Sequence, residues 1–190
     1  MRTISRHDVG LIFLLLAVSL LCTTLQSLNL TALAEWRADY IEQGQWMRIL
    51  SGNFAHTNFA HLTMNLAVLW VIAFVFRPSV RSYAALLVII SIGVGIGILY
   101  TPIKSYVGLS GTLHGLFAYY ALREALQGRM SSWILVAGVV TKIIWELTVG
   151  SPISTAEIIN ARVAVEAHFL GVINGILFAL VSYPLYKNDR

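Results

Sequence analysis

Long apolar stretches alternate with short polar segments along the whole chain. A transmembrane helix needs about 20 mostly apolar residues to cross the hydrocarbon core of a bilayer. The pattern therefore predicts an all-α membrane protein, a bundle of six transmembrane helices that forms one domain over residues 1–190. The helices are expected at about residues 9–30, 59–76, 82–100, 110–126, 133–149 and 161–183.

The most polar part of the chain is the segment 31–58, which joins the first two predicted helices. It carries charged residues such as Glu35 and Arg48 among aromatic ones such as Trp36 and Trp46. Aromatic side chains beside charged ones are typical of the headgroup layer of a membrane. We expect this segment to lie in or on the outer interface, with residues 101–109 and 150–160 as loops on the same side.

The composition agrees with a membrane protein, since 57% of the residues are hydrophobic and only 12% are charged. A soluble domain carries about 25% charged residues, so the expected surroundings are a lipid bilayer. The net charge of +4 comes from scattered basic residues, which argues against binding of nucleic acid. With Cys22 as its single cysteine, the chain can form neither an internal disulfide nor a thiolate metal cluster.

Basic residues are unevenly divided between the two sides that six spans define. The side that holds both termini carries most of them: Arg2, Arg6, Arg77, Arg81, Arg123, Arg129, Lys187 and Arg190. Because positively charged loops are retained in the cytoplasm, we predict that both termini are cytoplasmic. The segments 31–58, 101–109 and 150–160 then face outward.

A serine flanked by glycines begins the fourth predicted helix, in the motif G-L-S-G-T-L-H-G at residues 108–115. If Arg123 marks the inner boundary of this helix, the helical rise places Ser110 about 20 Å further out. The hydrocarbon core is about 30 Å thick, so the serine would lie inside the membrane, and irregular backbone at that depth needs a wet cavity. His168 in the last predicted helix is expected at a similar depth.

Small residues at matching spacing lie next to both polar residues. Gly111 and Gly115 form one G-x-x-x-G pair, and Gly171 and Gly175 form another. Such pairs let helix backbones approach closely, so we expect the two helices to pack against each other. The motif is common in membrane helices, and general packing alone is the alternative explanation.

Serine, histidine and nearby hydrogen-bond donors together suggest nucleophilic catalysis. A serine hydroxyl becomes an effective nucleophile when a base accepts its proton, and His168 is the candidate base for Ser110. His61 and Asn65 share one face of the second predicted helix. With the backbone N–H of Ser110 they are assigned to an oxyanion hole, which His56 could supplement.

Each of these polar residues also has a structural explanation. Ser110 could be only a helix N-cap, and Asn65 could join helices by a hydrogen bond. Lys142 and Glu146 are four residues apart on one helix, and we expect them to satisfy each other. Glu166 is two residues before His168 and points to another face, so we exclude it as a third catalytic residue. The hypothesis is a Ser–His dyad.

The chain resembles the rhomboid intramembrane serine proteases over nearly its whole length. The similarity rests on G-L-S-G with Gly108, Ser110 and Gly111, on H-x-x-x-N at 61–65, and on A-H-x-x-G-x-x-x-G at 167–175. It implies that Ser110 is the nucleophile and His168 the general base, with His61 and Asn65 lining the oxyanion hole. It also implies a multi-pass protein of the bacterial inner membrane whose active site opens to the periplasmic side.

One departure narrows the resemblance. Rhomboids commonly carry a tyrosine four residues after the serine, whereas this chain has His114 followed by Gly115. The motif is similar to that of the rhombosortase branch, which implies membrane-anchored substrates with a C-terminal Gly-Gly motif, a hydrophobic helix and a basic tail. His114 could stack on His168, change the pKa of His168, or take part in transfer of the acyl group. Alternatively, it only replaces the tyrosine in packing.

Other functions are less well supported by the residues. A general rhomboid protease with other transmembrane substrates is the nearest alternative, and a binding protein without activity would be expected to lack Ser110 or His168. A metal site could use His56, His61, His114 and His168, but they lie on separate elements without a metal-binding motif. We therefore expect no metal and no cofactor. Whether the acyl group passes to water or to an amine stays open.

Overall fold

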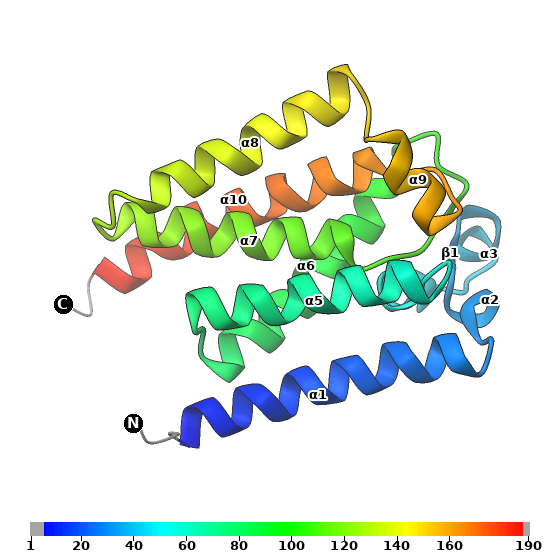
Figure 1. Ribbon diagram of the computed structural model, residues 1–190, viewed down its shortest axis with the longest axis horizontal. Helices are drawn as coiled ribbons and strands as arrows, with labels where there is room; N and C mark the ends of the chain where they lie inside the picture. The colour runs from blue at the N-terminus through cyan, green and yellow to red at the C-terminus, as the bar shows by residue number, and fades with distance from the viewer. Residues whose placement is uncertain (1–5, 188–190) are drawn as a thin grey trace.

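Apolar helices form the body of the molecule, and the computed structural model describes them over residues 6–187 (Figure 1). A helix lies at each of the six positions that the hydrophobic pattern predicts. They are α1 (Arg6–Ser27), α5 (Phe59–Phe76), α6 (Val80–Ile98), α7 (Ser110–Leu126), α8 (Ser132–Thr148) and α10 (Val165–Lys187). Arg2 and Arg190, used above to predict the topology, lie outside the described residues.

Several of these helices can cross a membrane by their length and composition. Within residues 6–187, α1, α5, α6 and α10 do so individually. Helix α8 does so only together with α9 (Ile153–Ile159), to which it is joined at a bend of 87°. Helix α7 has 17 residues, about 25 Å at 1.5 Å per residue, which is shorter than the hydrocarbon core. The protein is thus a multi-pass, all-α membrane bundle.

Helix α7 is the central element, because it contacts α5, α6, α8 and α10 (Figure 1). Its packing against α10 depends on the two predicted glycine pairs. A Cβ atom on Gly171 would lie 1.8 Å from the carbonyl oxygen of Gly111, and one on Gly175 would lie 2.1 Å from that of Gly115. The two backbones are therefore in direct contact, as the spacing of the glycines predicts.

The segment 31–58 folds into short elements that pack on the C-terminal part of α6. They are α2 (Thr31–Ala34), β1 (Trp36–Arg37), α3 (Ala38–Glu42), α4 (Arg48–Ser51) and the 3-10 helix η1 (Gly52–Phe54). The buried guanidinium of Arg48 holds the segment together by donating to the carbonyl oxygens of Ala32 and Glu35. The indole N–H of Trp36 donates to the carbonyl of Gly95 at 2.9 Å.

Residues 101–109 are held to this segment by a short antiparallel ladder. Strand β2 (Ser105–Tyr106) pairs with β1, with Trp36 opposite Tyr106. Trp36 and Tyr106 are both buried. The chain that leads into the central helix α7 is thereby anchored to the segment 31–58.

The predicted boundaries differ from the structure in the last third of the chain. Residues 153–159, expected in a polar loop, form helix α9, which ends at Asn160 in a left-handed conformation with φ 51°. Side chains at the start of α5 hold it, because Thr57 donates to the carbonyl of Ile159 and Asn58 to that of Ile158. Helix α10 begins at Val165 rather than 161 and continues to Lys187.

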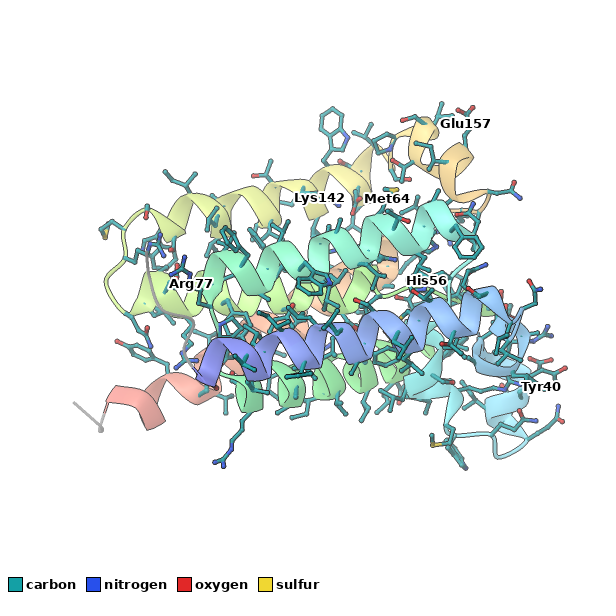
Figure 2. The ribbon with its side chains drawn as sticks, turned by 60° about the horizontal axis from the view of Figure 1, so that its bottom comes forward. Tyr40, His56, Met64, Arg77, Lys142 and Glu157 are labelled. Carbon is teal, nitrogen blue, oxygen red and sulfur yellow. The ribbon has the colours of Figure 1, made fainter. Side chains whose placement is uncertain are left out.

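The two ends of the bundle differ in character. The first described residues of α1 and the last of α10 lie at the same end (Figure 1). Arg77, in the turn between α5 and α6, lies at that end too, whereas Tyr40 of α3 and Glu157 of α9 lie at the opposite end (Figure 2). The segment 31–58, α9 and the ladder thus form one polar layer at the end of the bundle opposite the described ends of α1 and α10.

Candidate active site

The backbone before α7 is shaped so that the loop passes close to α5 just before Ser110 begins the helix. Gly108 has φ 124°, a left-handed conformation that favours glycine. A Cβ atom there would lie 2.7 Å from Cε1 of His61. The Gly108 N–H donates to the carbonyl of Gly52 at 3.1 Å, and the hydroxyl of Tyr106 donates to the Gly108 carbonyl. Gly108 therefore allows the loop to pass directly against His61.

The structure brings Ser110 and His168 together. Oγ of Ser110 lies 2.9 Å from Nε2 of His168, within hydrogen-bond distance. The approach follows from the contact of α7 and α10, because the backbones meet at Gly111, next to Ser110, and at Gly171, about one turn after His168. His168 is buried, with 6% of its surface exposed. The arrangement allows the hydroxyl proton of the serine to pass to the imidazole.

Glu146 is part of this cluster, and the sequence analysis did not assign it there. Its Oε2 lies 2.8 Å from Nδ1 of His168, while its Oε1 accepts from Nζ of Lys142 at 2.6 Å. The predicted pair of Lys142 and Glu146 is thus present, but it uses only one carboxylate oxygen. The available signal was a carboxylate deep in an apolar helix, since such residues are rarely without function.

Asn65 offers an unused hydrogen-bond donor beside the serine. Its side chain is buried, and its Nδ2 has no hydrogen-bond partner among the described residues. It lines the same cavity as Ser110 and points toward Gly108, where a Cβ atom would lie 3.7 Å from Nδ2. A buried amide N–H without a partner is costly, and a developing oxyanion would satisfy it.

The hydrogen bonds of His61 define which of its nitrogens carries a proton. The hydroxyl of Thr57 donates to the carbonyl of Ile159, so it accepts from Nδ1 of His61 at 3.1 Å. A neutral His61 then has no proton on Nε2. It would donate to an oxyanion through Nε2 only in its protonated form, which makes Asn65 the stronger candidate donor.

His56 lies behind His61 rather than over the serine. The two rings meet edge to face with centroids 5.1 Å apart, and His56 does not line the cavities described below. Burial lowers the pKa of His56 to about 3, so its imidazole is neutral near pH 7. His56 was predicted to supplement the oxyanion hole, but in the structure it packs against His61 instead.

His114 stacks on His168, which is one of the roles left open above. The ring centroids are 4.2 Å apart with an angle of 19° between the planes. Nδ1 of His114 lies 2.7 Å from the carbonyl oxygen of Ser110. A carbonyl only accepts, so Nδ1 carries the proton and Nε2 presents a lone pair.

Two connected cavities meet at Ser110. One, of about 570 Å³, is lined in part by residues of α5, α8 and α9, among them Met64 and Lys142, whose positions Figure 2 labels. The other, of about 430 Å³, is apolar and lies between α5, α7 and α8. Ser110, His114, Asn65 and Lys142 line both. The cavity expected above the serine is therefore present.

The same cluster can be tested as a metal site. Ligand atoms of His114, Glu146 and His168 lie within 4.8 Å of one another. However, the two imidazoles are stacked, so their in-plane lone pairs run side by side and do not converge on one point. Nδ1 of His168 also faces Glu146 at hydrogen-bond distance. This donor set favours proton transfer over metal binding.

Fold and site together define a multi-pass membrane protein in which a half-buried serine contacts a buried histidine at a cavity. A rhomboid domain matches residues 43–185, which is more than half of the chain, and the chain therefore belongs to the rhomboid family. Members of this family are intramembrane serine proteases, which places the chain among hydrolases. No curated protein matches the chain.

Proposed function

We propose that this protein is a rhombosortase-like intramembrane endopeptidase that uses Ser110 and His168. It would cleave the C-terminal membrane anchor of exported proteins, which consists of a Gly-Gly motif, a hydrophobic helix and a basic tail. The bundle would span a bacterial inner membrane six times, with both termini in the cytoplasm and the active site open to the periplasm. The clustering of the polar layer at the end opposite the termini supports this orientation.

The observation that carries the proposal is the 2.9 Å contact between Oγ of Ser110 and Nε2 of His168 at the floor of a cavity. In the first step the serine oxygen attacks the scissile carbonyl, and its proton passes to Nε2 of His168. Asn65 and the backbone N–H groups at the start of α7 donate to the oxyanion. The imidazolium then returns the proton to the departing amine, which leaves an acyl-serine.

The apolar cavity supports a transmembrane substrate with glycines at the cleaved bond. It adjoins Ser110 between α5, α7 and α8, where an apolar helix of another protein can lie. Glycine destabilises a helix, so a Gly-Gly segment can extend into the cavity that Asn65 and His114 line beside Ser110. The acyl-serine would then react with water or with an amine acceptor.

The proposal is tested by co-expressing the protein with a candidate substrate that ends in a Gly-Gly motif, a hydrophobic helix and a basic tail. We expect cleavage next to the glycines, read as a new C-terminus by mass spectrometry. The mass also separates hydrolysis from transfer, since an amine acceptor adds its own mass. A matched substrate with both glycines replaced by leucine is the control and should stay intact.

Equal cleavage of both substrates would contradict the rhombosortase assignment and favour a rhomboid protease of broader specificity. Absence of any cleavage, together with absence of fluorophosphonate labelling at Ser110, would favour a binding protein. His114→Tyr, which installs the residue common in rhomboids, separates the roles of His114. A changed preference for the Gly-Gly substrate assigns His114 to specificity, whereas unchanged cleavage assigns it to packing.

Asn65→Ala is expected to slow cleavage about 10²- to 10³-fold, the loss typical of removing one oxyanion donor. The physical reason is that its Nδ2 has no other partner among the described residues. The measurement is kcat in proteoliposomes, with Thr63→Ala as the control, because Thr63 is exposed on the same helix. An unchanged kcat for Asn65→Ala would exclude it from the oxyanion hole.

A further inference from the structure

A catalytic pair of Ser110 and His168 alone does not explain why the carboxylate of Glu146 lies beside His168. Its carboxylate is 6% exposed and lies on α8, facing His168 on α10. An unpaired carboxylate inside a membrane is costly, so the packing of α8 against α10 has placed this charge where both of its oxygens find a donor. Oε2 faces Nδ1 of His168 at 2.8 Å, and Oε1 faces Lys142 at 2.6 Å.

We propose that Glu146 is a positioning residue that turns the pair into a Lys142–Glu146–His168–Ser110 relay. This proposal rests on the proposed function of Ser110 and His168 as a nucleophile and its base. A carboxylate accepts hydrogen bonds and cannot donate them. Nδ1 of His168 therefore carries the proton, and Nε2 presents its lone pair to the hydroxyl of Ser110.

This tautomer is the one that a general base requires. A neutral imidazole has one N–H, and if that proton were on Nε2 the ring could not accept the proton of the serine. When the proton is transferred, the imidazolium forms directly beside the carboxylate, which stabilises its charge. Glu146 would thus act on the reaction through His168 without touching the substrate.

Lys142 orients the carboxylate and makes the relay testable. An ammonium group only donates hydrogen bonds. In a Glu146→Gln variant the amide oxygen would therefore face Lys142, and the amide NH₂ would face Nδ1 of His168. An NH₂ group donates, so Nδ1 would have to lose its proton and Nε2 would carry it. The substitution would thus enforce the unproductive tautomer, and Lys142 would be responsible.

The experiment measures the labelling of Ser110 by a fluorophosphonate in the purified full chain, so that no substrate needs to be known. We expect Glu146→Gln to lower the maximal labelling rate about 10²-fold or more, the direction that loss of the correct tautomer has in serine proteases. The probe concentration at half-maximal rate should stay unchanged, because glutamine has nearly the size and shape of the Glu146 side chain that it replaces in the cavity wall. Glu146→Asp should recover part of the rate.

The double variant Lys142→Met/Glu146→Gln gives the decisive comparison. Without the ammonium, the glutamine amide is free to turn its oxygen toward Nδ1, so labelling should rise about 10-fold over Glu146→Gln alone, as expected where two neighbouring residues are coupled. Glu166→Gln is the matched control, since Glu166 pairs with Arg162 and not with His168. It should label at the rate of the unmodified protein.

The outcomes separate this inference from the proposed function. If the unmodified protein is not labelled at Ser110, the proposed function itself is wrong. If it is labelled but Glu146→Gln reacts at the same rate, or the double variant is no faster than Glu146→Gln, the relay is wrong while the serine chemistry stands. Circular dichroism and thermal unfolding of each variant identify any loss of folding. If Glu146→Gln does not fold, the labelling rate of Glu146→Asp is compared with that of the unmodified protein instead.

Discussion

Replacing Ser110 by alanine is expected to lower proteolytic cleavage by about 10³-fold or more, because the remaining groups can bind and polarise the substrate but cannot form the acyl intermediate. His168→Ala should have a similar effect, since the hydroxyl of Ser110 would lose the base that lies 2.9 Å away. The measurement is the appearance of product from a membrane-anchored substrate in proteoliposomes. Labelling by a fluorophosphonate should disappear in Ser110→Ala.

Ser151→Ala is the matched control, because Ser151 lines the same cavity and contacts none of the proposed reacting groups. Its cleavage rate should equal that of the unmodified protein. The double variant Ser110→Ala/His168→Ala should be no slower than either single variant, because the two residues act as a unit. Cleavage that survives Ser110→Ala would show that another residue is the nucleophile.

Gly171→Ala is expected to destabilise the bundle by about 3 kcal/mol or more, at the upper end for overpacking a core. The added Cβ atom would lie 1.8 Å from the carbonyl oxygen of Gly111, and backbone cannot move aside as a flexible side chain can. Separation of α7 from α10 would also draw His168 away from Ser110. We therefore expect both a lower thermal midpoint in detergent and a loss of cleavage.

Gly138→Ala is the control for the same substitution at a position without a close neighbour. A Cβ atom on Gly138 meets no atom within 4 Å, and the residue lies inside α8. Alanine favours a helix over glycine by up to about 1 kcal/mol, so the midpoint should stay or rise. An unchanged midpoint in Gly171→Ala would show that α7 and α10 are not held in the close contact that the structure describes.

The elements and the contact of Ser110 with His168 were predictable because they depend on local chemistry. A transmembrane helix is defined by the length of its apolar run, and helices are present at all six predicted positions. Ser110 and His168 stood out as polar residues next to glycine pairs. The same glycines then predicted the contact of α7 and α10, since close approach needs only small side chains at the right spacing.

Helix α9 and the position of His56 were not predictable in this way. Residues 153–159 lack a long apolar run, and their helix is held by hydrogen bonds from Thr57 and Asn58, about a hundred residues earlier in the chain. His56 was expected near the oxyanion hole from its distance along the chain to His61. Its ring instead packs edge to face against that of His61 and lines neither cavity at Ser110, and the distance along the chain gives no information on this contact.

Of the two contacts of the Glu146 carboxylate, the one with Lys142 was predictable from the sequence and the one with His168 was not. Residue type and spacing are enough to predict a membrane bundle, a serine at the start of an apolar helix and a histidine that meets it. They also account for Glu146 by a pair with Lys142, one turn away. That the second carboxylate oxygen faces His168 could be found only from the fold, because the rotation of α8 against α10 depends on packing between helices that are distant in the chain.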